Sequence, residues 1–110
     1  MPPISGCTSR SKASRPKRRV ANEARDRGLV VVPHCWKSGI GIAASMQLAA
    51  ISPACHFIEY LPVEMADSRL RRELVVDEYP LVDGRLELPD RPGIGVTLNE
   101  DALREFRVEV

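Results

Sequence analysis

The sequence predicts an α/β fold with parallel strands joined by a helix. Two short strand-like runs, 29–32 and 56–60, end within two residues of a proline, and the residues between them include a long run of helix formers. Proline cannot donate a hydrogen bond to a strand ladder, so pairing should stop at Pro33 and Pro62. A crossover helix makes the two strands parallel. Because parallel strands need neighbours on both edges, the chain is expected to belong to a larger α/β protein.

The N-terminal part is predicted to be irregular and then helical. Residues 1–17 are rich in Ser, Pro and basic residues and have no hydrophobic period. Pro16 suits a first helical turn, and the pattern favours a helix over 17–27 that ends at Gly28. The apolar face of this helix would comprise Val20, Ala21 and Ala24. The strand at 29–32 follows directly, and its composition favours burial on both faces.

A second helix is predicted over 41–51. It is apolar nearly all round, with only Ser45 and Gln47 polar, so most of its surface should be buried. Gly39 and Gly41 permit a tight turn at its start.

The C-terminal part is predicted to contain three short elements. Asp67 can cap an exposed helix, 67–73, and an Asp-Gly pair predicts a β-hairpin within 81–88. Asn99 can cap a last helix, 99–106.

Composition excludes several classes of protein. A chain of 110 residues allows one small domain, and its net charge of +1 implies no particular partner. Basic residues are concentrated in 1–19, which contain no acid. This stretch could bind nucleic acid or an anionic surface, or act as a transit-type leader. It lacks interleaved aromatic residues for base stacking, so we expect a solvated tail and no nucleic-acid partner.

Three cysteines without CxxC spacing indicate a reducing compartment, and we expect the protein to be cytoplasmic. No apolar run reaches the roughly 18 residues of a membrane span, so no membrane association is expected. The pairs 34–35 and 55–56 join His to Cys, but neighbouring residues in a strand point to opposite faces. We therefore predict no zinc site and name no metal ligand in this chain.

The candidate site lies where the two strands end. His34 follows the first strand and Glu59 lies at the end of the second, and carboxyl ends of parallel strands are where chemistry occurs in such folds. Gly39 and Gly41 could bind a carboxylate through helix N-terminal amides, and Trp36 is included with them as a candidate substrate-binding residue. From position alone, a structural histidine and an ordinary surface carboxylate remain open as alternatives.

Five ordered stretches carry a family resemblance. They read RVANEARDRGLVVVPHCWKSGIGIAASMQLAAISP, FIEYLP, DSRLRRELV, VDGRLELPDRPGIGV and LNEDALREFRV. Over 18–110 the chain resembles the C-terminal end of the enolase superfamily, in the mandelate racemase/muconate lactonizing enzyme group. The resemblance implies the last two strand–helix units of a (β/α) TIM-type barrel, followed by a hairpin-containing tail.

The resemblance also implies a chemistry. Such enzymes use Mg²⁺ to abstract the α-proton of a hydroxy-carboxylate; a sugar-acid dehydratase is expected first, with racemases and cycloisomerases as alternatives. It makes His34 a general acid/base and Glu59 a carboxyl group that hydrogen-bonds the substrate carboxylate. The family's Mg²⁺ ligands and Lys base lie on strands that we do not find in this sequence, and Pro3 stands where relatives carry the Asp that orients the His.

Without these Mg²⁺ ligands and the Lys base, the chain by itself is not expected to have the activity of the parent enzyme. We expect it to be inactive and not to bind Mg²⁺, although Mg²⁺ serves the parent enzyme. The alternative function is that of a non-catalytic truncated remnant, which associates with an intact homologue or with itself.

Overall fold

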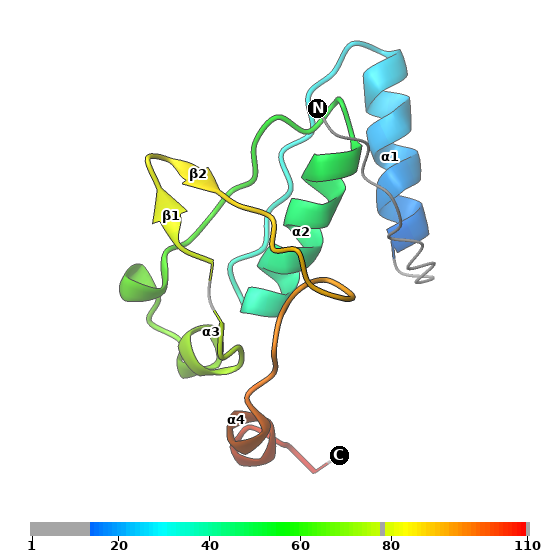
Figure 1. The fold of residues 1–110 in the computed structure, drawn as a ribbon. Helices are drawn as coiled ribbons and strands as arrows, with labels where there is room; N and C mark the ends of the chain where they lie inside the picture. Colours follow the sequence, from blue (N-terminus) through cyan, green and yellow to red (C-terminus); the bar gives the residue numbers. More distant parts are fainter. Residues whose placement is uncertain (1–13, 78, 110) are drawn as a thin grey trace.

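The structure, a computed structural model, describes residues 14–77 and 79–109. Within these ranges, no helix is long and apolar enough to cross a membrane. The elements in chain order (Figure 1) are α1 (Ser14–Asp26), α2 (Gly39–Ile51), the 3₁₀ turn η1 (Val63–Met65), α3 (Arg69–Glu73), β1 (Leu81–Val82), β2 (Arg85–Leu86) and α4 (Glu100–Glu105).

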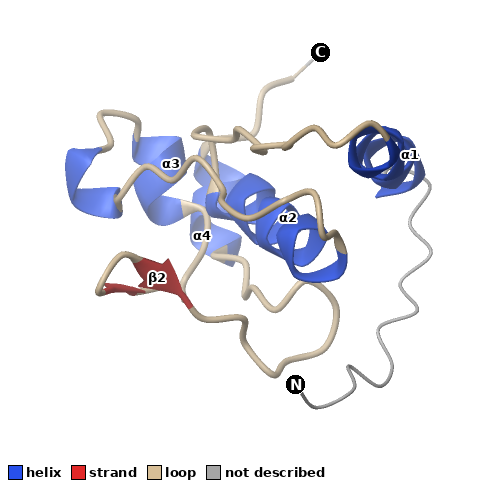
Figure 2. Cartoon of the chain, turned by 90° about the horizontal axis from the view of Figure 1, so that it is seen from above, coloured by secondary structure: helices blue, strands red, loops and turns tan. Residues whose placement is uncertain are grey.

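Helix α2 lies at the centre of the molecule, with α1 on one side and the β1–β2 hairpin on another (Figure 2). Two apolar clusters form along it. The first contains Ile42, Ala43, Met46 and Tyr79, and the second contains Ala21, Leu48 and Cys55. The helix begins at Gly39 rather than at residue 41, because Ser38 caps it and its hydroxyl accepts a hydrogen bond from the Gly41 amide.

Helix α1 begins at Ser14, so the prediction of an irregular segment is wrong for residues 14–17; residues 1–13 lie outside the described part. Pro16 is tolerated there because the first amides of a helix have no intrahelical acceptor. Ala21 and Ala24 are buried as predicted, whereas Val20 is 62% exposed and does not belong to the buried face. The helix ends before Gly28, which has a positive φ of 68°.

The two predicted strands form one isolated parallel bridge instead of a ladder. His34 pairs with Glu59, the Val31 amide donates to the Ala54 carbonyl at 2.8 Å, and the Glu59 amide donates to the Pro33 carbonyl at 2.9 Å. The parallel direction is as predicted. A ladder does not develop because Pro33 has no amide hydrogen to donate.

The two extended segments are covered on one face only. Val31 packs toward α1 and α2, while Ile58 and Tyr60 pack against the α2 cluster. Alternate residues of an extended segment point to opposite sides. Accordingly Val30, Val32 and Phe57 are 58%, 48% and 67% exposed, and the prediction of a strand buried on both faces is wrong. We call these three side chains the open face.

The C-terminal part follows its local signals more closely. The hairpin forms with Leu81 opposite Leu86, and Asp83 and Gly84 both have positive φ, as a type I′ turn requires. Asn99 caps α4 by accepting hydrogen bonds from two backbone amides. Helix α3 differs from expectation in its cap, which is Ser68, and in its exposure, because Arg71 is only 1% exposed.

Ion pairs join α3 to α4. Arg69 makes paired hydrogen bonds to Glu73 and also binds Glu105, with N–O distances of 2.7–3.2 Å. The Arg69 guanidinium lowers the pKa of the Glu73 carboxyl below its ordinary value. Near the hairpin, hydrogen bonds from Thr97 and then Arg91 lower the pKa of Asp77.

We predict that this part of the fold is sensitive to acid. A carboxyl group with a lowered pKa stabilises the folded state above its ordinary pKa, and this stabilisation is lost as the pH falls through the folded-state pKa. Thermal melts should therefore show a lower midpoint below about pH 4.5. Because these ion pairs are exposed, Glu73→Gln should remove only about 2–4 °C of that pH dependence.

Glu87→Gln is the matched control, since Glu87 is exposed and lies in no described ion pair. A Glu73→Gln melting profile that follows the wild-type profile at every pH would show that the Arg69–Glu73 ion pair contributes nothing to stability.

Candidate functional site

The structure places His34 and Glu59 next to each other. The imidazole Nδ1 lies 2.7 Å from Glu59 Oε2, and the side chains are 57% and 49% exposed. A carboxylate can only accept, so Nδ1 carries the hydrogen and donates it. The two residues come together because the parallel bridge joins their backbones and both follow their segments on the same side.

This hydrogen bond fixes the orientation of the imidazole. With Nδ1 bound to a carboxylate, Nε2 is the nitrogen available for proton transfer, and it has no hydrogen-bond partner among the described residues. The resemblance had implied that His34 lacks its orienting carboxylate, because Pro3 replaces an Asp; Pro3 lies outside the described residues. In the structure the carboxylate beside Nδ1 is that of Glu59, a contact that the sequence analysis did not predict.

Trp36 also lies at this site. Its ring centroid is 5.0 Å from that of His34, with the planes tilted by 42°, and the side chain is 41% exposed. The indole can therefore form an apolar wall beside the imidazole.

The two candidate glycines have different surroundings. Gly39 is buried at the first position of α2. The Gly41 amide donates to the Ser38 hydroxyl at 3.3 Å, so the structure gives it a partner within the chain. Gly41 is also required for packing, since a Cβ there would lie 1.9 Å from Cys35 Sγ. Ser38 was not predicted as a site residue, although a serine just before an apolar helix is a recognised capping signal.

The described residues do not fit a Mg²⁺ site. Among residues 14–77 and 79–109, no group of three or more His, Cys, Asp or Glu side chains is arranged to hold a metal ion. We therefore derive no step through Mg²⁺ from the residues of this chain.

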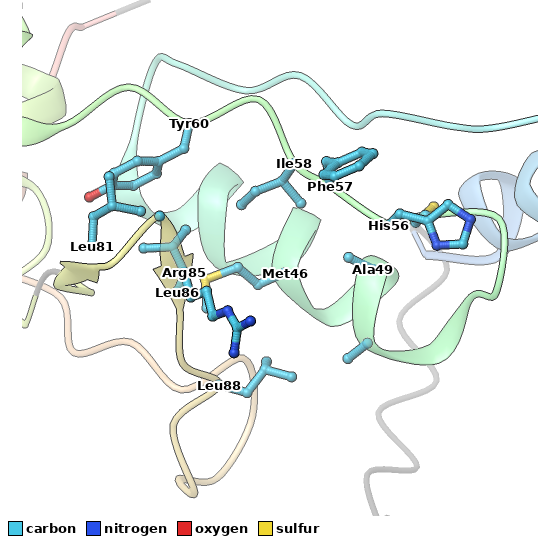
Figure 3. A pocket seen from close by; sticks show the side chains of 13 residues that line it. Met46, Ala49, His56, Phe57, Ile58, Tyr60, Leu81, Arg85, Leu86 and Leu88 are labelled. Carbon is cyan, nitrogen blue, oxygen red and sulfur yellow. The ribbon is translucent and has the colours of Figure 1, made fainter.

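A separate pocket of about 420 Å³ lies between α2, residues 55–60 and the hairpin (Figure 3). It is lined mainly by apolar side chains, among them Met46, Ile58 and Leu86. Neither His34 nor Glu59 lines it. The candidate acid–base pair and this pocket are therefore distinct features.

With the fold and the pair in place, the class of protein follows. Residues 8–102 match the family of enolase C-terminal domain-like proteins, and the chain belongs to that family, within the mandelate racemase/muconate lactonizing enzyme group of the enolase superfamily.

Two relatives show how much of a family member this chain covers. The chain is 32% identical to D-galactarolactone cycloisomerase of Agrobacterium fabrum over 97% of its own length and 29% of that protein. It is 33% identical to D-xylonate dehydratase of Haloferax volcanii over 86% of its length and 22% of the relative. The chain thus spans less than a third of these proteins.

Two solved structures of similar proteins superpose on this chain. A candidate racemase superposes with a TM-score of 0.70 and 37% identity, over 82% of this chain and 24% of that chain. An enolase from Agrobacterium radiobacter, proposed to be a galactarate dehydratase and bound to Na and L-malate, gives a TM-score of 0.70 and 30% identity, over 81% of this chain and 25% of that one.

We predict that Gly41→Ala destabilises the chain by about 1–3 kcal/mol, because the new methyl group overlaps Cys35 Sγ. Cys35→Ala in the same chain should restore part of the loss, since the two residues are in contact. Urea unfolding of both single variants and the double variant measures this. If the losses simply add in the double variant, the close approach of Cys35 to Gly41 is not what requires the glycine.

Proposed function

We propose that His34 and Glu59 are an acid–base pair from the active site of a sugar-acid dehydratase of the enolase superfamily. The observation that carries this is the 2.7 Å contact between Nδ1 and the Glu59 carboxylate. The relative from Haloferax volcanii is a D-xylonate dehydratase, which supports the reaction class. L-malate in the solved relative is itself a small hydroxy-carboxylate, which supports the substrate class. Racemisation and cycloisomerisation are the alternative outcomes of the same α-proton abstraction.

In this proposal each residue has a defined task. His34 Nε2 exchanges a proton with the substrate, and Glu59 holds Nδ1–H so that Nε2 points at a fixed place. Trp36 and Gly39 border the substrate, whereas the Gly41 amide serves the helix cap. In a dehydration, loss of the α-proton is followed by departure of the β-hydroxyl as water, and the leaving oxygen needs a proton from an acid such as an imidazolium.

The chain is proposed to supply only part of the site. It spans 22–29% of the length of the curated relatives quoted above, and its described residues do not fit a metal site. We therefore propose that catalysis needs the remainder of a barrel, together with the Mg²⁺ of the parent reaction, and that the chain by itself is inactive. A cytoplasmic location is part of the same proposal, on the basis of the cysteine usage.

Grafting residues 14–110 onto the barrel and cap of a full-length relative tests the assignment. The chimera should exchange the α-proton of the relative's own substrate with deuterated solvent, as followed by proton NMR. His34→Asn should lower that exchange by about 10²–10⁴-fold, because the amide can still bind Glu59 but cannot transfer a proton. Mg²⁺ affinity should be unchanged.

His56→Asn is the matched control, because His56 lines the apolar pocket and does not contact Glu59 in the structure. Undiminished exchange in the His34→Asn chimera would mean that His34 is structural and that the proposed role is wrong.

A second candidate function is docking without catalysis, on an intact homologue or on a second copy of the chain. The open face favours it, because Val30, Val32 and Phe57 expose apolar side chains beside each other. Because this face is made of side chains, its occupant is proposed to be an apolar surface of an intact homologue that packs against it face to face.

Val32→Thr and Phe57→Ser should weaken such association by about three- to tenfold each, from the apolar area that they remove. Sedimentation velocity, on the chain alone and mixed with a full-length relative, measures the effect. Val20→Thr on α1 is the control for Val32→Thr, since Val20 is similarly exposed but lies away from the open face. Equal effects of the two valine substitutions would argue against docking through the open face.

A further inference from the structure

Arg71 is the most deeply buried charged side chain among the described residues. It lies on α3 and is 1% exposed, although its helix is otherwise largely exposed. A buried guanidinium is costly unless its N–H groups are bonded. Its Nη2 donates to the Leu61 carbonyl at 2.7 Å, and its guanidinium carbon lies 5.9 Å from the centre of the Tyr60 ring.

Tyr60 is held from a second direction. Its hydroxyl donates to the Tyr79 carbonyl at 3.1 Å, and the Tyr79 hydroxyl in turn donates to the Gly95 carbonyl at 3.0 Å. The two residues that directly follow Glu59 are therefore both fixed to the C-terminal part of the chain.

The position of the Glu59 carboxylate depends on how the backbone around it is held. Its side chain is about half exposed, so its direction is set mainly by the backbone on either side of it. On the N-terminal side, the Glu59 amide is bound to the Pro33 carbonyl. On the C-terminal side, Arg71 binds the Leu61 carbonyl. A displacement of about 1 Å would lengthen the 2.7 Å contact with His34 beyond hydrogen-bonding distance.

We propose that Arg71 is a positioning residue for the acid–base pair: it fixes the backbone after Glu59, so that the carboxylate holds His34 in the Nδ1–H tautomer. The inference rests on the proposed function of the pair, but its test does not use activity. The other arginines of α3 are arranged differently. Arg72 binds the carbonyls of Ala66 and Asp67, before the helix, and Arg69 binds carboxylates.

The 110-residue chain contains two histidines, so ¹⁵N NMR of histidine-labelled protein gives two sets of imidazole signals. At alkaline pH, where imidazole is neutral, the nitrogen shifts report the ratio of the Nδ1–H to the Nε2–H tautomer. In Arg71→Met we expect this ratio for His34 to fall at least about threefold, as residues coupled through a backbone shift affect one another on this scale. The ratio for His56 should stay the same.

Arg72→Met is the matched control and should leave the His34 tautomer ratio unchanged. Arg71→Lys keeps a cationic donor and should give an intermediate ratio, and it decides the question if Arg71→Met does not fold. A folded Arg71→Met or Arg71→Lys variant with the wild-type ratio would overturn the proposal. So would loss of the fold in both variants while Arg72→Met remains folded, because Arg71 would then be a structural residue only.

The two proposals fail separately. If the tautomer ratio responds to Arg71 but the His34→Asn chimera keeps full exchange, positioning holds and the catalytic assignment is wrong. If exchange depends on His34 but the tautomer ratio does not change in Arg71→Met, the catalytic assignment holds and the positioning role of Arg71 is wrong.

Discussion

The hydrogen bond from the Glu59 amide to the Pro33 carbonyl sets the register on which the site depends. Side chains alternate along an extended segment, so this register sends Ile58 and Tyr60 toward α2 and leaves Glu59 on the other side with His34. A shift by one residue would turn Glu59 toward the apolar cluster, where an unpaired carboxylate is costly. The packing of Ile58 and Tyr60 against α2 therefore fixes the register in which His34 and Glu59 pair, although these two side chains are themselves half exposed.

Helix α2 is the rigid element that holds both halves of the site, the loop with His34 and the segment with Glu59. At its N-terminus, the Ser38 cap and the approach of Cys35 to Gly41 hold the loop that carries His34. Along its side, Met46 and its neighbours form the surface on which Ile58 packs. The polar pair is thus positioned by apolar packing and by one helix cap, and its own hydrogen bond adds little to stability because it is exposed to solvent.

The sequence predicted features that depend on local chemistry, and it failed where tertiary contacts decide. The Asp-Gly turn, the Asn99 cap and the Gly28 helix end need only their neighbours in the chain, and all three were predicted correctly. The burial of Arg71 was missed because a charged residue in a basic run is normally solvated, and the contacts that favour its burial, among them the Leu61 carbonyl and the Tyr60 ring, are tertiary. The strand ladder was overpredicted, because β-branched composition indicates an extended segment but does not supply a pairing partner.

The sequence predicted from chain topology alone that His34 and Glu59 lie close together. It therefore could not predict which atoms of the two side chains interact. Parallel segments joined by a helix place their carboxyl ends at one edge, but the contact between Glu59 and Nδ1 is seen only in the structure. The same alternation places the open face on the side of this pair. Whatever covers Val30, Val32 and Phe57 also shields His34 and Glu59 from water, and electrostatic interactions strengthen as the local dielectric constant falls. In the two proposed functions, burial of the open face would therefore strengthen the hydrogen bond that orients the imidazole, so docking on an intact homologue would also favour the acid–base role of the pair.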